Sequence, residues 1–175
     1  CEHDLDAVCQ RFSDALASFG YPECPGKIMV SNAEWRHPAT AFAQRAKGWL
    51  LNPSGDNMMA LAIFLDAHAV CGDASLLEQV RGDLFKLATD NGMLLARFAA
   101  AIESFEEGQG WWNRLLSLGG DEANQLDLKK AGTFPLVHGV RALALEARLR
   151  QTSTAARIEA LVTAEKLPAQ MGTDL

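Results

Sequence analysis

The sequence predicts an all-α fold, a bundle of about six to seven helices. Apolar residues recur every three or four positions over most of the chain, which is the spacing of one face of an α-helix. Short stretches rich in Gly, Pro, Asn or Asp separate these segments, and β-branched runs that would indicate strands are scarce. Hydrophobic residues make up 49% of the 175 residues, which is enough for a substantial core.

The first two predicted helices are separated by a loop. The first ends at Gly20, and its apolar stripe consists of Leu5, Val8, Cys9, Phe12, Leu16 and Phe19. Residues 21–32 contain two prolines and a glycine, so we interpret them as a loop and as the best candidate for an internal boundary. The second helix begins at Pro38 and ends at Asn52-Pro53.

The third predicted helix is the most apolar part of the chain. It runs from Met58 to Val70, with Asp56 or Asn57 as its cap, and is expected at the centre of the bundle. It is shorter than the ~20 residues that a bilayer requires, and no secretion signal opens the sequence. Together with four cysteines that lack Cys-x-x-Cys spacing, this predicts a cytoplasmic protein with no membrane contact.

Four more helices are predicted towards the C-terminus. Their defining apolar residues lie within 76–87 (the helix ending near Asn91-Gly92), 94–105, 136–147 and 158–162, and the last helix has Thr152 or Ser153 as its cap. Between Glu106 and Gly132 the helical period is lost. Two alternating runs in that stretch, Leu116–Leu118 and Leu126–Leu128, allow one small β-hairpin near residues 115–129.

Charge and motifs exclude several classes of function. The formal net charge of −6 disfavours a nucleic-acid partner, and we interpret the four tryptophans Trp35, Trp49, Trp111 and Trp112 as packing residues. No Gly-x-Ser-x-Gly turn and no glycine-rich phosphate loop occurs. Cys1-x-His3 and His68-x-x-Cys71 lack further ligands at metal-binding spacing, so we expect no metal and no catalysis by this chain alone.

Asp66 is the residue that points most clearly to a specific interaction. A buried carboxylate in an apolar helix destabilises the fold unless an Arg, a Lys or other hydrogen-bond donors pair with it. It can form a buried ion pair, for which Arg141 is a candidate, or it can line a cleft together with His68 and Asp73 at one end of the bundle. Asp127, Lys129 and Lys130 lie in an irregular connection, where they can be solvated or bind an anion. We expect Lys129 rather than Lys130 to make any anion contact.

Four strings carry a family resemblance: CPGKIMVSNAEWR (24–36), IFLDAHAVCGD (63–73), LDLKKAGTFPLVHGVRALAL (126–145) and TSTAARIEAL (152–161). They resemble the C-terminal nucleotidyltransferase substrate-binding domain of bacterial signal-transduction proteins that also carry CBS or cyclic-nucleotide-binding modules. In that family the domain follows a nucleotidyltransferase domain similar to the PII-protein uridylyltransferase. The resemblance covers about residues 20–167.

The resemblance implies two parts, residues 1–32 as the tail of an upstream nucleotidyltransferase domain and residues 33–175 as the helical substrate-binding domain. The residues that match family motifs, and to which it implies substrate contacts, are Asn32, Trp35, Arg36, Asp66, Asp73, Asp127, Lys129 and Arg141. No cofactor is implied for this chain, whereas Mg²⁺ and a nucleoside triphosphate are implied for the full-length parent. No Gly-Ser turn followed by an Asp-x-Asp metal site occurs, and His68 stands where the family usually has Arg.

Two functions follow from the resemblance. The first is a non-catalytic substrate-binding and regulatory domain that closes over a nucleotidyltransferase active site, with an unknown protein or small molecule as acceptor. The alternative is an interaction or homodimerisation module that relays signals from CBS or cyclic-nucleotide-binding domains. A cleft shared by Asp66, Asp73, Asp127 and Lys129 would favour the first, and a flat apolar patch the second.

Overall fold

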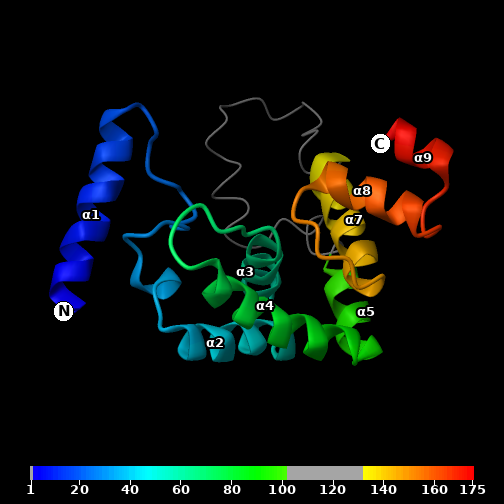
Figure 1. The fold of residues 1–175 in the computed structure, drawn as a ribbon, viewed down its shortest axis with the longest axis horizontal. Coiled ribbons are helices and arrows are strands. Elements are labelled where there is room, and N and C mark those ends of the chain that lie inside the picture. The colour runs from blue at the N-terminus through cyan, green and yellow to red at the C-terminus, as the bar shows by residue number, and fades with distance from the viewer. Residues whose placement is uncertain (1, 102–131) are drawn as a thin grey trace.

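The computed structural model describes residues 2–101 and 132–175, and this part of the chain is helical without a strand (Figure 1). Its α-helices are α1 (Glu2–Ser18), α2 (Ala39–Leu51), α3 (Gly55–Leu65), α4 (Ala74–Thr89), α5 (Gly92–Ala100), α7 (Phe134–Glu146), α8 (Thr154–Thr163) and α9 (Ala169–Asp174). A short 3-10 helix, η1 (Ala33–Trp35), precedes α2. The all-α prediction is confirmed, while the hairpin expected near residues 115–129 lies outside the described residues.

The helices from α2 onward pack against one another, partly out of sequence order, since the broadest contact is that between α2 and α4. α2 lies against both α3 and α4, α5 lies against α4 and α7, and α8 links α7 to α9. α1 stands at one edge of the molecule, with α8 and α9 at the opposite edge (Figure 1). Among the described helices, α1 shares no broad contact with any other.

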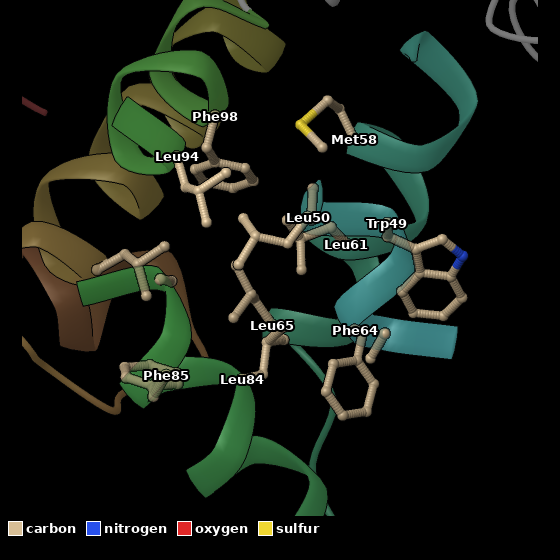
Figure 2. Packing of buried hydrophobic residues seen from close by; sticks show 14 of the residues in the cluster. Trp49, Leu50, Met58, Leu61, Phe64, Leu65, Leu84, Phe85, Leu94 and Phe98 are labelled. Carbon is tan, nitrogen blue, oxygen red and sulfur yellow. The ribbon is translucent and has the colours of Figure 1, made fainter. Parts of the chain in front are cut away.

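The core has two clusters of buried side chains. The larger one joins α2, α3, α4 and α5, with Leu50, Leu61, Leu84 and Phe98 almost completely buried (Figure 2). The smaller one joins α7 and α8 around Leu161. No helix among the residues described here is long and apolar enough to span a bilayer.

The start of α3 differs from the prediction. Ser54, rather than Asp56 or Asn57, caps the helix, and its hydroxyl accepts a hydrogen bond from the Asn57 amide at 3.2 Å. Ser54 has the extended backbone of an N-cap residue, while Asp56 lies inside the first turn, where its charge favours the helix dipole. At α8, the predicted choice between two caps falls on Ser153.

The end of α3 also differs, because the helix stops at Leu65 instead of Val70. Asp66 is its C-cap residue, and His68, Val70 and Cys71 lie exposed in an irregular connection. Val70 is 87% exposed. Gly72, with φ +80°, then turns the chain into α4. Apolar composition continued past the helix end, but the polar contacts of Asp66 determine where the helix stops.

α1 forms and ends as predicted. Gly20 has φ +91°, and the Tyr21 amide donates to the Leu16 carbonyl at 3.0 Å, which closes the last turn. The apolar stripe of the helix nevertheless lies largely exposed, and the residues that α1 buries are Cys9 and Ser13.

Candidate functional site

Three buried arginines converge on the C-terminal end of α3. Arg81 comes from α4, Arg141 from α7 and Arg157 from α8, and we call them the arginine cluster. Arg141 and Arg157 bind the carboxylate of Asp66, while Arg81 binds the carbonyl of Ala67, the next residue. Four helices therefore contribute one charged residue each to this point of the structure.

Asp66 accepts hydrogen bonds from two of these arginines. Arg141 forms a fork, with Nε donating to Oδ1 at 2.9 Å and Nη2 donating to Oδ2. Nη1 of Arg157 donates to Oδ1 at 2.6 Å. The ion pair expected between Asp66 and Arg141 is confirmed, and Arg157 is a second partner that sequence reasoning missed.

The remaining donors of the cluster satisfy backbone carbonyls. Nη2 of Arg157 donates to the Leu65 carbonyl at 3.1 Å, and Arg81 donates to the carbonyls of Ala67 (3.4 Å) and Arg150 (3.0 Å). The last carbonyls of a helix have no partner within the helix and carry partial negative charge. The arginine cluster thus caps α3 with donors from neighbouring helices and fixes the connections that follow α3 and α7.

Burial and charge act in opposite directions on Asp66 and Arg157. Burial alone would raise the pKa of the Asp66 carboxyl, but the hydrogen bonds and charges of Arg141 and Arg157 outweigh burial and lower that pKa below its ordinary value. Burial lowers the pKa of Arg157 against the opposing attraction of Asp66, and the charges of Arg141 and Arg81 lower it further. An arginine remains protonated at neutral pH even so.

Among residues 2–101 and 132–175, positive charge exceeds negative charge at this site. Glu78 lies 3.5 Å from Arg81 and 3.4 Å from the exposed Arg150, so two carboxylates face four guanidinium groups. The Asp66 side chain is 36% exposed, and the cluster therefore meets solvent on that side. Planar guanidinium groups held in place by hydrogen bonds are suited to recognise a carboxylate or a phosphate.

Three of the predicted site residues lie instead at the junction between α1 and the bundle. Asn32 caps η1 by accepting a hydrogen bond from the Glu34 amide at 3.0 Å, and Trp35 packs against Trp49 with ring centroids 5.5 Å apart. Arg36 pairs with Asp6 of α1 at 2.6 Å, and the hydrogen bond to Asp6 raises the pKa of Arg36. The contacts recorded for all three are structural.

Asp73 has a local role as the N-cap of α4. It accepts a hydrogen bond from the Ser75 amide at 2.9 Å, and hydrogen bonds from Ser75 lower the pKa of its carboxyl. Two pockets lie beside α1 and one lies between α5 and α7. Neither Asp66 nor Asp73 lines any of these three pockets. Asp127 and Lys129 of the predicted site, with Lys130, lie outside the described residues.

Arg81 and Arg157 could have been found from the sequence. Arg81 follows Val80 and lies three residues before Leu84, and Arg157 lies four residues before Leu161, so both occupy core positions of their helices. A charged residue at such a position needs a partner for the same reason that Asp66 does. Among residues 2–101 and 132–175, no group of three or more His, Cys, Asp or Glu side chains is placed to hold a metal ion.

Two family models match parts of the chain. Residues 92–175 match the model described as "Putative nucleotidyltransferase substrate binding domain", and residues 1–56 match "Putative nucleotidyltransferase DUF294". The resemblance to a nucleotidyltransferase and its substrate-binding domain is confirmed. Arg141 and Arg157 lie in the first match, whereas Asp66 and Arg81 lie between the two.

The pair of matches associates this chain with a nucleotidyltransferase domain. The domain boundary expected at residue 32 stays a prediction. No curated protein and no solved structure matches the chain significantly.

Proposed function

We propose that this chain is the helical, non-catalytic part of a nucleotidyltransferase and that it binds an anionic group of the substrate at the arginine cluster. The observation that carries this proposal is the convergence of Arg141 and Arg157, both inside the matched substrate-binding segment, on the half-exposed Asp66. In an acidic chain this site has an excess of positive charge. Asp66 holds both guanidinium groups in fixed orientations, which is the preorganisation that anion recognition requires.

In this proposal the nucleotidyltransferase domain catalyses the transfer of the nucleotidyl group, and this chain only binds substrate. Nucleotidyl transfer depends on carboxylate-held Mg²⁺ to neutralise the charge that develops on the phosphates. Because no Gly-Ser turn followed by an Asp-x-Asp pair occurs in this chain, we place the catalytic Mg²⁺ site in the partner domain, while an anionic group of the nucleotide or acceptor contacts the arginine cluster. Purified chain supplied with UTP and Mg²⁺ should release no pyrophosphate above a mock preparation, and metal-dependent release would overturn this division.

Calorimetric titration of the chain with UTP and Mg²⁺ tests the anion site. Arg141→Gln should weaken binding at least about tenfold, because it removes a guanidinium charge from the site and leaves more of the Asp66 charge to repel the anion. Arg148→Gln is the matched control just beyond the end of α7, where the exposed Arg148 pairs with Asp90 at 3.2 Å, and should change binding less than about twofold. If Arg141→Gln unfolds, Arg141→Lys keeps the charge without the fork. No binding by the wild type, or equal losses in both variants, would refute the proposal.

The resemblance extends the proposal to a cytoplasmic bacterial signalling protein in which CBS or cyclic-nucleotide-binding modules regulate the transferase. A relay function in place of substrate binding is the second candidate, and the exposed apolar stripe of α1 favours it. The two are separated by whether the parent protein loses acceptor binding or only its response to the regulatory ligand when Arg141 is replaced.

A further inference from the structure

The two carboxylates at the arginine cluster are held in different ways. Asp66 accepts hydrogen bonds of 2.6 and 2.9 Å from two buried arginines, and its side chain is 36% exposed. The Glu78 side chain, on α4, is 53% exposed, and its oxygens lie 3.5 Å from Nη1 of Arg81 and 3.4 Å from Nη1 of Arg150. Charge-assisted N–H···O bonds are normally about 2.7–2.9 Å long. Asp66 is therefore bonded firmly and Glu78 loosely.

The two guanidinium groups opposite Glu78 are positioned by other contacts. Arg81 is buried, and its Nη2 donates to the backbone carbonyl of Arg150 at 3.0 Å. The guanidinium carbon of Arg150 lies 5.6 Å from the centroid of the Phe85 ring, which is the distance of a cation–π contact. None of these contacts involves Glu78, so both guanidinium groups remain in place when the Glu78 side chain moves away.

The arrangement around Glu78 is that of an occupied oxyanion site. One oxygen of its carboxylate, Oε1, faces Arg81, and the other, Oε2, faces Arg150. An anion that carries several oxygens on one central atom can bridge two guanidinium groups in the same way. A phosphate group has three such oxygens and up to two negative charges, compared with the single charge of a carboxylate.

Glu78 can leave this position at little cost, whereas Asp66 cannot. An ion pair between exposed side chains contributes little to stability, because water solvates the separated charges almost as well. Withdrawal of Asp66 would instead leave Arg141 and Arg157 buried without the carboxylate with which both pair. A ligand therefore displaces Glu78 and leaves the contacts of Asp66 intact.

We propose that Arg81 and Arg150 form the ligand-facing half of the arginine cluster, and that Glu78 occupies this half until a phosphate group displaces it. This inference rests on the proposed function and names the chemical class that the site takes. Because Glu78 belongs to the same chain, it competes at a high effective concentration. Glu78 therefore lowers the affinity of the site and favours the more highly charged phosphate over a carboxylate.

Replacement of Glu78 tests the competition, by calorimetric titration of the whole 175-residue chain with UTP and Mg²⁺ and, separately, with inorganic pyrophosphate. Glu78→Gln should tighten the binding of both probes at least about threefold, because the amide keeps the size of the side chain but has no charge with which to compete. Asp83→Asn is the matched control, since Asp83 also lies on α4, is 59% exposed and pairs with Lys47 at 3.4 Å. It removes the same charge and should change binding less than about twofold.

Replacement of Arg150 tests the ligand contact. Arg150→Gln should weaken the binding of both probes at least about fivefold, because it removes a charge-assisted donor. Arg148→Gln is its control, since the side chains of Arg148 and Arg150 are 64% and 60% exposed and each pairs with one carboxylate. No tightening in Glu78→Gln beyond that in Asp83→Asn, or equal losses in the two arginine variants, would overturn the proposal.

The same titrations separate this inference from the proposed function. If Arg141→Gln weakens UTP binding and Glu78→Gln does not tighten it, the anion site stands and the role of Glu78 is refuted. If the wild type binds no UTP but Glu78→Gln binds pyrophosphate, Glu78 blocks the site and substrate binding by the wild type is refuted. If no variant binds either probe, both are refuted.

Discussion

α1 and α3 both carry apolar side chains at helical spacing, yet the side chains of α3 are buried and those of α1 are largely exposed. α3 lies in the larger core, with Leu61 and Phe64 buried, and its end is held by arginines from three other helices. α1 exposes its stripe, and the ion pair of Asp6 links it to the rest of the chain. The difference teaches that apolar periodicity predicts a helix and its apolar face, but not whether that face packs in the core of the same chain.

The charged contacts of the two helices differ in the same direction. Arg141 and Arg157 are buried, so water screens their attraction to Asp66 weakly, and removal of Asp66 would take away the carboxylate with which both pair. The Asp6 carboxylate is 54% exposed, and solvent and salt weaken its attraction to Arg36. The contacts of Asp66 therefore stabilise the packing of α3 against α7 and α8, whereas the pair of Asp6 and Arg36 orients α1.

The largest expected effect comes from truncating the buried stripe of α3. Leu61→Ala should lower the free energy of unfolding by about 2 to 5 kcal/mol, because Leu61 is almost fully buried and its removal leaves a cavity. Leu5→Ala on α1 should change it by less than about 0.5 kcal/mol. Urea unfolding followed by circular dichroism measures both, and similar losses would show that α1 is as firmly packed as α3.

Removing the carboxylate at the end of α3 should have the next largest effect. Asp66→Ala should cost about 3 kcal/mol, the lower end of the range for breaking a buried ion pair, because solvent reaches part of the side chain. Asp66→Asn keeps an acceptor for Arg141 and Arg157 and should cost less. A loss below about 1 kcal/mol in the urea melt of Asp66→Ala would mean that the cluster is solvated rather than structural.

The helices were predictable because each has a strong local signal. Gly20 and Asn52-Pro53 interrupt the chain where the sequence indicated. The early end of α3 was not predictable from local pattern, since Asp66 is tied to Arg141 and Arg157, 75 and 91 residues away along the chain. α9 also escaped prediction because it is short and fits against α8 through Gly172, where a Cβ would come within 2.5 Å of Val162.

The candidate site was predictable in part for the same reason. Asp66 and Arg141 are charged residues among apolar ones, so they could be recognised in the sequence. Arg81 and Arg157 lie in helices with the pattern of ordinary amphipathic segments, in which most charged residues face solvent. Asn32 and Arg36 matched family motifs, and the structure gives them contacts that join α1 to the bundle. A motif match therefore marked these residues without distinguishing a structural contact from a ligand contact.

Acid should weaken the bundle through His138, which packs against Phe98 in the interior. Burial lowers the pKa of His138 below its ordinary value, so the unfolded chain takes up this proton at a higher pH than the folded chain. The free energy of unfolding should therefore fall as pH decreases below about 6.5, by at most about 1.4 kcal/mol per pH unit. The pKa of the Asp66 carboxyl is lowered in the folded chain, so the contribution of Asp66 to the free energy of unfolding should be lost only below about pH 4.

Urea melts between about pH 7 and about pH 5 measure this slope. His138→Gln should flatten it even if the variant is less stable at every pH, and His68→Gln, at an exposed position, should leave it unchanged. A slope that survives in His138→Gln would assign the titration to another group.

The smallest expected effect on stability is that of Asp6→Ala, because the Asp6 carboxylate is exposed and the core does not include it. Its consequence should instead be local: without the pair to Arg36, the amides of α1 should exchange hydrogen faster while those of α3 keep their protection. Asp14→Ala is the matched control on α1, since Asp14 bonds only to Gln10 of the same helix among the interactions described. Added salt should speed exchange in the wild type and leave Asp6→Ala unchanged, because salt screens the exposed pair that the variant lacks. Equal exchange in the two variants would show that other contacts orient α1 and that it is attached as firmly as the helices of the bundle.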